Sequence, residues 1–192
     1  MNTLILNGET SDSSETILYR VKETLIDECK TRGRQVTAYD LASMEIKPCN
    51  GCFHCWVKTP GLCIIHDAQA EILKSMVKSD LIVLLTPITF GGYSSNLKKV
   101  LDRFIPILLP FFKTVNNEIH HFQRYKQRRR LVAVGTLPEA DEEAEGIFRY
   151  LLKRNGVNMD ATNIASLILY EKMDAVEVKR NLQELLATGE AA

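Results

Sequence analysis

Short continuous runs of apolar residues alternate along this chain with longer segments in which apolar residues recur every three or four positions. Residues 4–6 and 81–85 are runs of the first kind and predict buried strands, whereas 13–32 is of the second kind and predicts an amphipathic helix. The same patterns predict the remaining elements: strands at 36–39, 131–134 and 164–169, and helices at 68–77, 93–104, 139–155 and 173–186.

Strands that alternate with helices predict a parallel sheet, because each strand must return to the same end of the sheet through a crossover. We therefore expect an α/β fold with a doubly wound five-stranded parallel sheet, flavodoxin-like, in strand order 2-1-3-4-5. In that order the ligand crevice lies at the carboxyl ends of the first and third strands. The loops at 7–15 and 86–93 are the ones that would line it.

One connection is too long for a compact domain. About 25 residues separate the helix that ends near Phe104 from the strand that begins at Leu131. Residues 114–120 predict a small hairpin, since the pair Asn116-Asn117 tolerates the positive φ of a tight turn. We interpret 105–129 as an insertion that acts as a lid or an interface, within a single flavodoxin-like domain over 1–192 that also carries a cysteine-rich loop at 47–67.

Composition narrows the class of protein. The chain has 192 residues, of which 45% are hydrophobic and 25% charged, and this composition excludes low-complexity disorder. Its formal net charge of +0 gives no basic excess for phosphate contacts, so we expect no nucleic-acid partner. The N-terminus lacks a signal-peptide pattern and the longest apolar run is too short for a bilayer. We expect a soluble cytoplasmic protein that does not bind membranes.

The two candidate loops each allow two interpretations. The first, from Gly8 to Thr16, is rich in hydroxyl side chains and precedes a helix, so it suits an anion; its polar side chains would equally suit helix capping. In the second, Gly91-Gly92 would let the backbone approach a flat ring beside Phe90, or would only form a turn before the next helix.

Four of the five cysteines lie close together in sequence. Cys49, Cys52 and Cys55 recur every three residues, and Cys63 follows the turn at 59–61. Four thiolates in so compact a run suit a four-iron cluster, and they also suit zinc. Free thiols packed in a loop are the third alternative, because reduced cysteine is often simply buried.

Two stretches together resemble the NADPH-dependent FMN reductase and iron–sulfur flavoprotein families. Residues 46–55, followed by Cys63 and Asp67, are similar to the compact cysteine motif of the iron–sulfur flavoproteins. Residues 86–103 are similar to their isoalloxazine loop and following helix. The first loop departs from the pattern: residues 9–11 replace the usual Ser-Pro-Arg, and Glu15 precedes Thr16 where an Asn-Thr pair is common.

The resemblance implies an FMN-dependent NAD(P)H oxidoreductase that takes hydride onto FMN and passes electrons to an acceptor, such as a quinone, a nitro compound or free flavin. The acceptor would be a small molecule or an electron carrier, and the protein a homodimer or higher homo-oligomer. FMN would be held by Gly8, Ser11, Ser13, Ser14 and Thr16 around its phosphate, by Pro87, Ile88, Thr89, Phe90, Gly91 and Gly92 along its ring, and by Gly135 and Thr136 at the ring's other edge.

The resemblance assigns no catalytic side chain, since the cofactor carries the chemistry. It also leaves two alternative functions open. In one, the chain is an iron–sulfur flavoprotein that carries electrons between protein partners, with a four-iron four-sulfur cluster on Cys49, Cys52, Cys55 and Cys63. In the other, it is a metal-stapled binding protein without flavin.

Overall fold

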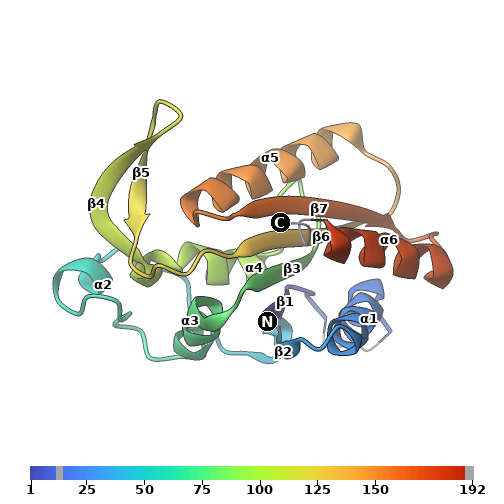
Figure 1. The fold of residues 1–192 in the computed structure, drawn as a ribbon, viewed down its shortest axis with the longest axis horizontal. Helices are drawn as coiled ribbons and strands as arrows, with labels where there is room; N and C mark the ends of the chain where they lie inside the picture. The colour runs from blue at the N-terminus through green and yellow to red at the C-terminus, as the bar shows by residue number, and fades with distance from the viewer. Residues whose placement is uncertain (12–14, 189–192) are drawn as a thin grey trace.

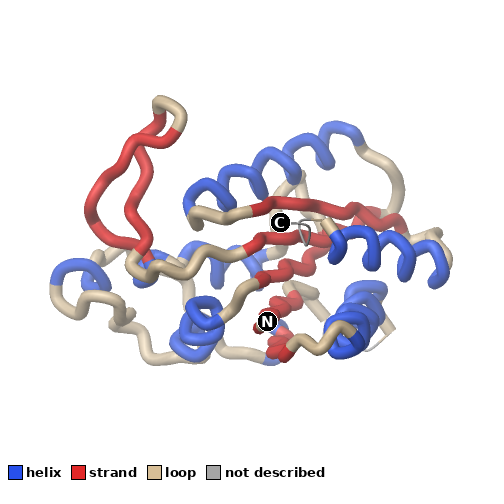
Figure 2. Tube along the Cα trace, in the orientation of Figure 1, coloured by secondary structure: helices blue, strands red, loops and turns tan. Residues whose placement is uncertain are grey.

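The computed structural model describes residues 1–11 and 15–188 and contains one central sheet (Figures 1 and 2). Its strands run parallel in the order β2-β1-β3-β6-β7. The five strands are β1 (Asn2–Asn7), β2 (Gln35–Asp40), β3 (Leu81–Pro87), β6 (Arg130–Leu137) and β7 (Asn163–Tyr170). Because β4 and β5 lie outside this sheet, the order is the predicted 2-1-3-4-5, and the flavodoxin-like prediction is confirmed.

Helices cover both faces of the sheet, as a doubly wound fold requires. The α-helices are α1 (Ile17–Thr31), α2 (His54–Val57), α3 (Gln69–Lys78), α4 (Ser95–Asp102), α5 (Glu142–Asn158) and α6 (Ala175–Ala187), and two short 3-10 helices are η1 (Leu41–Ser43) and η2 (Ile105–Ile107). No helix within 1–11 or 15–188 is long and apolar enough to cross a membrane.

The two faces of the sheet pack against two separate hydrophobic clusters. Leu4 and Leu6 of β1 pack in one cluster with residues of α3, α4 and α5, whereas Ile5 packs in the other with α1 and α6. Successive side chains of a strand point to opposite faces, so a continuous apolar run is what a strand with two covered faces needs. This is why the apolar runs located the sheet strands from sequence.

The insertion forms a two-stranded antiparallel hairpin of β4 (Leu108–Val115) and β5 (Glu118–Gln123), which stands away from the sheet in Figures 1 and 2. Its turn has Asn116 at φ 48° and Asn117 at φ 64°, as the predicted turn needs. The hairpin prediction is confirmed, and the strands are longer than expected. Leu108 is buried at its base, whereas Phe111 and Phe112 are each 64% exposed.

Candidate functional site

The first candidate loop leaves β1 beside the N-terminus of α4. Gly8 is buried there, and its N–H donates to the carbonyl of Leu85 at 2.7 Å. A Cβ on Gly8 would lie 2.7 Å from the Cβ of Leu97 and 2.9 Å from Ser94 Oγ. Those distances are too short for a side chain, so the close approach of the first loop to α4 requires glycine.

The start of α1 lies at the carboxyl edge of the sheet, as an anion site would require. Thr16 is the N-cap of α1, and its hydroxyl accepts the N–H of Tyr19 at 3.2 Å. Ser11 is exposed and lines a cavity of about 250 Å³ with Asn7, Glu9 and Tyr19. The predicted site residues Ser13 and Ser14 lie outside the described residues. Of the two sequence interpretations, capping therefore applies to Thr16, and the anion site stays a prediction.

The carboxylate of Glu9 already accepts one backbone N–H group of this loop. Its Oε1 accepts the N–H of Thr10 at 2.8 Å, and its carbonyl accepts from the Asn96 side chain at 3.1 Å. A phosphate in the loop would seek the same kind of backbone N–H group. The carboxylate of Glu9 and a bound phosphate would thus compete for the loop.

The second candidate loop forms a tight turn between β3 and α4. Thr89 and Gly92 exchange backbone hydrogen bonds at 3.1 and 2.8 Å. At the tip, Phe90 has φ 49° and is 99% exposed, and Gly91 has φ 72°. A Cβ on Gly91 would lie 2.6 Å from the Cβ of Ile147 in α5. Gly91 therefore allows the turn to lie directly on α5 in a left-handed conformation.

The end of β6 lies beside the second loop, and Gly135 and Thr136, expected just after a strand at 131–134, are part of β6. The N–H of Ile88 donates to the carbonyl of Thr136 at 2.9 Å, and Gly135 faces the Ile88 side chain so closely that a Cβ there would lie 2.6 Å from Cδ1. Ile88 is 9% exposed and belongs to the core. The structure therefore brings together Gly8, Pro87–Gly92 and Gly135–Thr136. Ile88 and Gly135 pack the second loop against the end of β6, whereas Thr89 and Phe90 are exposed.

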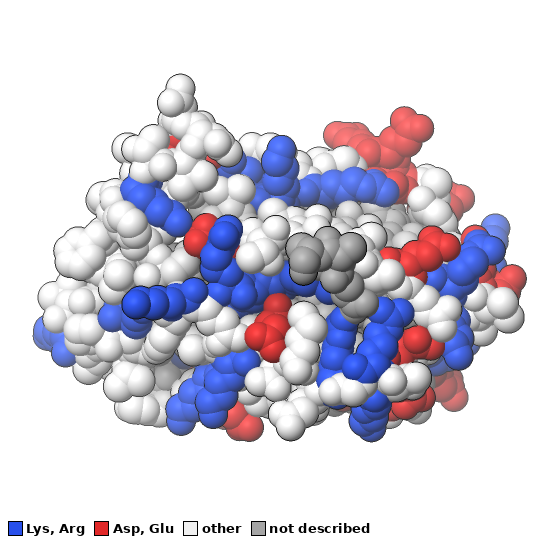
Figure 3. Space-filling view, in the orientation of Figure 1, with Lys and Arg blue, Asp and Glu red and all other residues white. Residues whose placement is uncertain are grey.

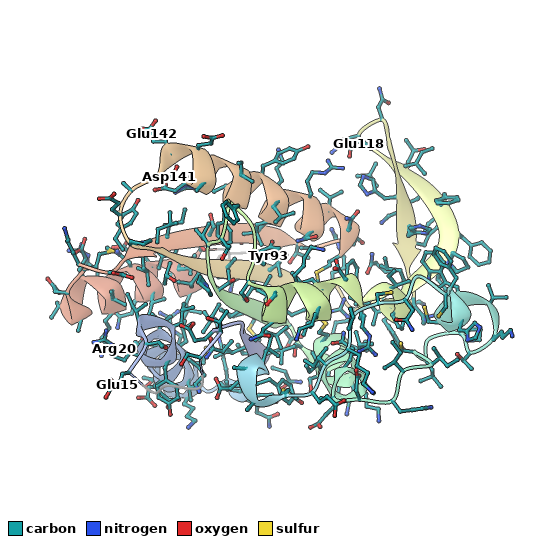
Figure 4. The ribbon with its side chains drawn as sticks, turned by 180° about the vertical axis from the view of Figure 1, so that it is seen from behind. Glu15, Arg20, Tyr93, Glu118, Asp141 and Glu142 are labelled. Atoms are coloured by element: carbon teal, nitrogen blue, oxygen red, sulfur yellow. The ribbon has the colours of Figure 1, made fainter. Side chains whose placement is uncertain are left out.

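Tyr93 holds the end of the second loop, as the view from behind in Figure 4 lets the reader follow. Its ring meets Phe148 of α5 edge-on at 5.8 Å, and its hydroxyl accepts from the Asn155 side chain at 3.0 Å. Burial raises the pKa of Tyr93 to about 12. The hydroxyl thus stays protonated near neutral pH, and Tyr93 anchors the loop to α5.

The cysteine loop lies around α2, which Figure 1 places with the hairpin at the end of the molecule away from α1 and α6. All four cysteines line one cavity of about 70 Å³, whose wall also includes Ile64, Ile65, Arg103 and Ile105. Cys49 and Cys52 are exposed, and Cys55 and Cys63 are half-buried free thiols. Burial, and then the neighbouring thiols led by Cys63, raise the pKa of Cys55.

The spacing of the thiols bears on what they could hold. Four thiolates on zinc lie about 2.3 Å from the ion, which places the sulfur atoms within about 4 Å of one another. Among the described residues, no three His, Cys, Asp or Glu side chains are arranged to hold a metal ion. All four thiols line one cavity, and a set of four cysteine sulfurs is a donor set that suits a four-iron cluster and also zinc. The predicted metal ligands stay a prediction.

Trp56 fixes α2 to the base of the hairpin. Its indole N–H lies 3.2 Å from the carbonyl of Ile105 and 3.1 Å from that of Leu108, so it donates to both. Its ring lies 4.7 Å from that of His121, which is 4.7 Å from the ring of Phe112. The cysteine loop and the insertion are therefore packed as one unit.

Sequence reasoning missed two side chains that organise these loops. Ser94 is 2% exposed; it caps α4 and bonds to Gly8. Arg103 is 1% exposed and lies in the wall of the cysteine cavity. A serine before a helix is a cap signal that could have been read. A single arginine at a helix end carries no such signal, since it usually faces solvent.

The chain is similar in sequence to several known proteins. The sequence profile of the family described as NADPH-dependent FMN reductase matches residues 1–124. An iron-sulfur flavoprotein of Methanocaldococcus jannaschii is 36% identical over 111 residues, covering 58% of this chain and 55% of that protein. One of Archaeoglobus fulgidus is 31% identical over 103 residues, covering 54% and 48%. The chain thus spans about half the length of the curated relatives it matches.

Solved structures show the same fold at low identity. An NAD(P)H:quinone oxidoreductase from Methanothermobacter marburgensis superposes with a TM-score of 0.69 at 14% identity, covering 96% of this chain and 95% of that one. An FMN-dependent NADH-azoreductase from Bacillus anthracis in complex with FMN superposes with a TM-score of 0.64 at 15% identity, also covering 96% and 95%. At such identities the likeness concerns the fold.

Proposed function

This chain belongs to the NADPH-dependent FMN reductase family, and on that premise we propose that it is an FMN-dependent NAD(P)H oxidoreductase. It would pass electrons from the reduced pyridine nucleotide to a small-molecule or protein acceptor. The observation that supports this most is the convergence of the loops after β1 and β3 with the end of β6 at the carboxyl edge of the sheet. Both loops have a glycine, Gly8 and Gly91, where a side chain would not fit.

The residues of this edge suit FMN in two regions. Backbone N–H groups and hydroxyls at the start of α1 would receive the phosphate, through Ser11 and Thr16 among the described residues and, on the sequence resemblance alone, Ser13 and Ser14. The turn at Pro87–Gly92 and the pair Gly135–Thr136 would receive the ring. When bound, FMN supplies the hydride and electron transfer chemistry.

The second loop offers the ring both donors and an apolar surface. The turn uses the N–H groups of Thr89 and Gly92 internally. Those of Phe90 and Gly91 have no backbone partner in the described part of the chain, so they are available to donate. The exposed Phe90 side chain would cover the ring and reduce its contact with water. We assign no acid or base to a side chain.

Calorimetry with FMN, followed by an NADH and NADPH oxidation assay, tests this proposal. We expect one FMN per chain and oxidation of at least one of the two nucleotides by the FMN-loaded protein. Absence of binding at about 100 μM, a limit of about −5.5 kcal/mol, would exclude the flavin site. A colourless protein that binds no FMN would then fit the third alternative, a metal-stapled binding protein.

We also propose that the protein is a homodimer or higher homo-oligomer in which the hairpin covers the flavin loops of a neighbouring subunit. Phe111 and Phe112 on β4 and Ile119 on β5 are at least 64% exposed, and so is Phe90 on the second loop. The hairpin also carries Lys113 and Glu118, which are paired with Asp160 and with Arg154, and acidic side chains gather near the start of α5 in Figure 3. Exposed aromatic side chains of this kind favour burial against a partner.

The cysteine cavity favours a second candidate function, that of an iron–sulfur flavoprotein acting as an electron carrier. The supporting observation is that four thiols from one loop line one cavity. Cys49, Cys52, Cys55 and Cys63 would hold the cluster, and its chemistry would be electron transfer. We further propose a cytoplasmic location, since a compact cysteine cluster is typical of metal-binding proteins in reducing compartments, where disulfides are rare.

Anaerobic purification tests the second candidate. We expect about four irons per chain, and Cys52→Ala should lose iron because an incomplete set of thiolates cannot complete the first shell. Cys29→Ala is the matched control, since Cys29 is buried in α1 away from the cavity. Wild-type protein with neither iron nor sulfide would refute the cluster while leaving the flavin proposal standing.

A further inference from the structure

A buried positive charge lies against one of the four cysteines. Arg103 follows the end of α4, and its Nη2 lies 3.3 Å from the sulfur of Cys63. Its Nη1 lies 2.5 Å from a carboxylate oxygen of Asp67, whose side chain is 3% exposed. A buried guanidinium needs such a partner, because an unpaired charge in the interior is very costly. Arg103 therefore brings a positively charged N–H donor to Cys63, and the carboxylate of Asp67 compensates the charge of the guanidinium.

The same guanidinium holds both ends of the cysteine loop. Nη1 donates to the carbonyl of Lys47 at 2.9 Å, and Nη2 donates to that of Ile65 at 3.3 Å. Lys47 precedes the first cysteine of the cavity by two positions, and Ile65 follows the last by two. One side chain thus fixes the segment that carries all four thiols.

Arg103 itself has little freedom to move. The side chain of Gln69, which is fully buried, donates to the carbonyls of Val100 at 3.0 Å and of Arg103 at 3.3 Å. These bonds fix the end of α4 from which the guanidinium extends. Gln69 of α3 therefore holds the backbone from which the guanidinium extends to Cys63.

We propose that Arg103 is a positioning residue that sets the reduction potential of an iron–sulfur cluster held by the four cysteines. This inference rests on the second candidate function. Reduction adds one electron to the cluster and breaks no bond, so the added negative charge is favoured by a nearby N–H donor and a positive charge. The carboxylate of Asp67 opposes this effect. Arg103 raises the potential, and Asp67 lowers it.

This assignment predicts shifts of opposite sign for the two partners of one ion pair. Arg103→Gln removes the charge and leaves the Asp67 carboxylate, so the potential should fall. Asp67→Asn leaves the guanidinium uncompensated, so the potential should rise. Arg103→Lys keeps the charge but cannot contact Cys63 and Asp67 together, and it should lie between Arg103→Gln and the wild type. A merely structural pair would show loss of the cluster in both variants, without opposite shifts.

The experiment is a redox titration of anaerobically reconstituted protein, followed by visible absorbance, with dithionite as reductant and ferricyanide as oxidant. Iron and FMN content are measured first. We expect each of Arg103→Gln and Asp67→Asn to change the oxidised-to-reduced ratio at fixed potential at least tenfold, about 59 mV for one electron. Lys98→Gln is the matched control, since Lys98 is an exposed cation on the same helix and should leave the potential unchanged.

Three results would overturn the proposal. Shifts of the same sign in the two variants, or ratios within twofold of the wild type, would remove Arg103 from this role while leaving the cluster in place. If Arg103→Gln loses its iron, Arg103→Lys and Asp67→Asn must still lie on opposite sides of the wild type. Wild-type protein without iron would refute both this inference and the second candidate function, and its FMN content would report separately on the reductase.

Discussion

The Ser94 hydroxyl donates a hydrogen bond to the carbonyl of Gly8, and its oxygen also accepts the N–H of Leu97 at 3.3 Å. Ser94 is 2% exposed, so water does not compete for either bond. The first bond fixes the loop after β1, and the second caps α4, which begins directly after the loop that follows β3. One buried hydroxyl thus sets the relative position of the two loops proposed to hold FMN.

Ser94→Ala should weaken both the fold and the flavin site. The change removes the cap of α4 and leaves the buried carbonyl of Gly8 unpaired, at a cost of about 1–2 kcal/mol in the free energy of unfolding. FMN affinity should fall because the two loops are no longer fixed to each other. Urea denaturation and calorimetry measure the two effects. Thr31→Ala, which removes an exposed hydroxyl bonded to Asp27, should change neither substantially.

Gly91→Ala should damage the second loop. The new Cβ would lie 2.6 Å from Ile147, on a residue at φ 72°, so the turn must move away from α5. We expect FMN affinity to fall at least tenfold, about 1.4 kcal/mol, as measured by fluorescence quenching. Gly146→Ala is the matched control: its Cβ would meet nothing within 4 Å, and alanine favours the helix. Equal affinities in both variants would show that the turn does not contact the flavin.

Glu9→Gln should strengthen FMN binding. The carboxylate of Glu9 accepts the N–H of Thr10 and would repel a phosphate dianion in the same loop. Removing its charge should raise the affinity a few-fold, more at low than at high salt, because screening weakens the repulsion. Glu184→Gln makes the same change in net charge on the exposed side of α6 and should have no effect. Unchanged affinity for Glu9→Gln would place the phosphate elsewhere.

The double variant Phe111→Asp with Phe112→Asp should abolish the proposed oligomer. Both side chains are 64% exposed on β4, and two carboxylates cannot be buried there without a large desolvation cost. Sedimentation at tens of micromolar should give an oligomer for the wild type and a monomer for the variant. Val176→Asp, at a position 80% exposed on α6, is the control and should leave the oligomer intact. A monomeric wild type would make the hairpin a lid over its own subunit.

The ion pair between Asp67 and Arg103 predicts a specific pH dependence. Burial acts to raise the pKa of Asp67, but the hydrogen bonds from Arg103 and from the N–H of Lys47 outweigh it, so this pKa lies below the ordinary value of 3.8. A carboxylate whose pKa is lowered on folding stabilises the folded state fully at pH values above its ordinary pKa. That stabilisation is lost as the pH falls through the folded-state pKa.

The wild type should therefore exceed Asp67→Asn in the free energy of unfolding by about 3 kcal/mol near neutral pH. The difference should hold down to about pH 5 and shrink progressively below about pH 4. Denaturant titrations across this range measure it. Asp102→Asn, which breaks the exposed pair with Lys98, should cost at most about 1 kcal/mol. A difference that is independent of pH would mean that the carboxylate does not stabilise the fold as an ion.

The sequence alone determined the sheet, because burial on two faces leaves a local signature. The run Leu4–Leu6 predicts a strand covered on both sides, and the structure places Leu4 and Ile5 in different cores. The hairpin turn was equally local, since Asn116 and Asn117 carry the positive φ that their side chains tolerate. The spacing of the cysteines likewise anticipated that they share one loop.

Only the tertiary structure decided which residues organise the sites. The bond from Ser94 to Gly8 spans 86 positions, and that from Arg103 to Cys63 spans 40. Ile88 and Gly135, expected along the flavin ring, pack against each other because β3 and β6 are neighbours in the sheet. The hydrophobic pattern along the chain indicates whether a position is buried, because the face that a residue occupies follows from the local helix or strand. It does not indicate which distant residue contacts that position, because this depends on how the helices pack across the sheet.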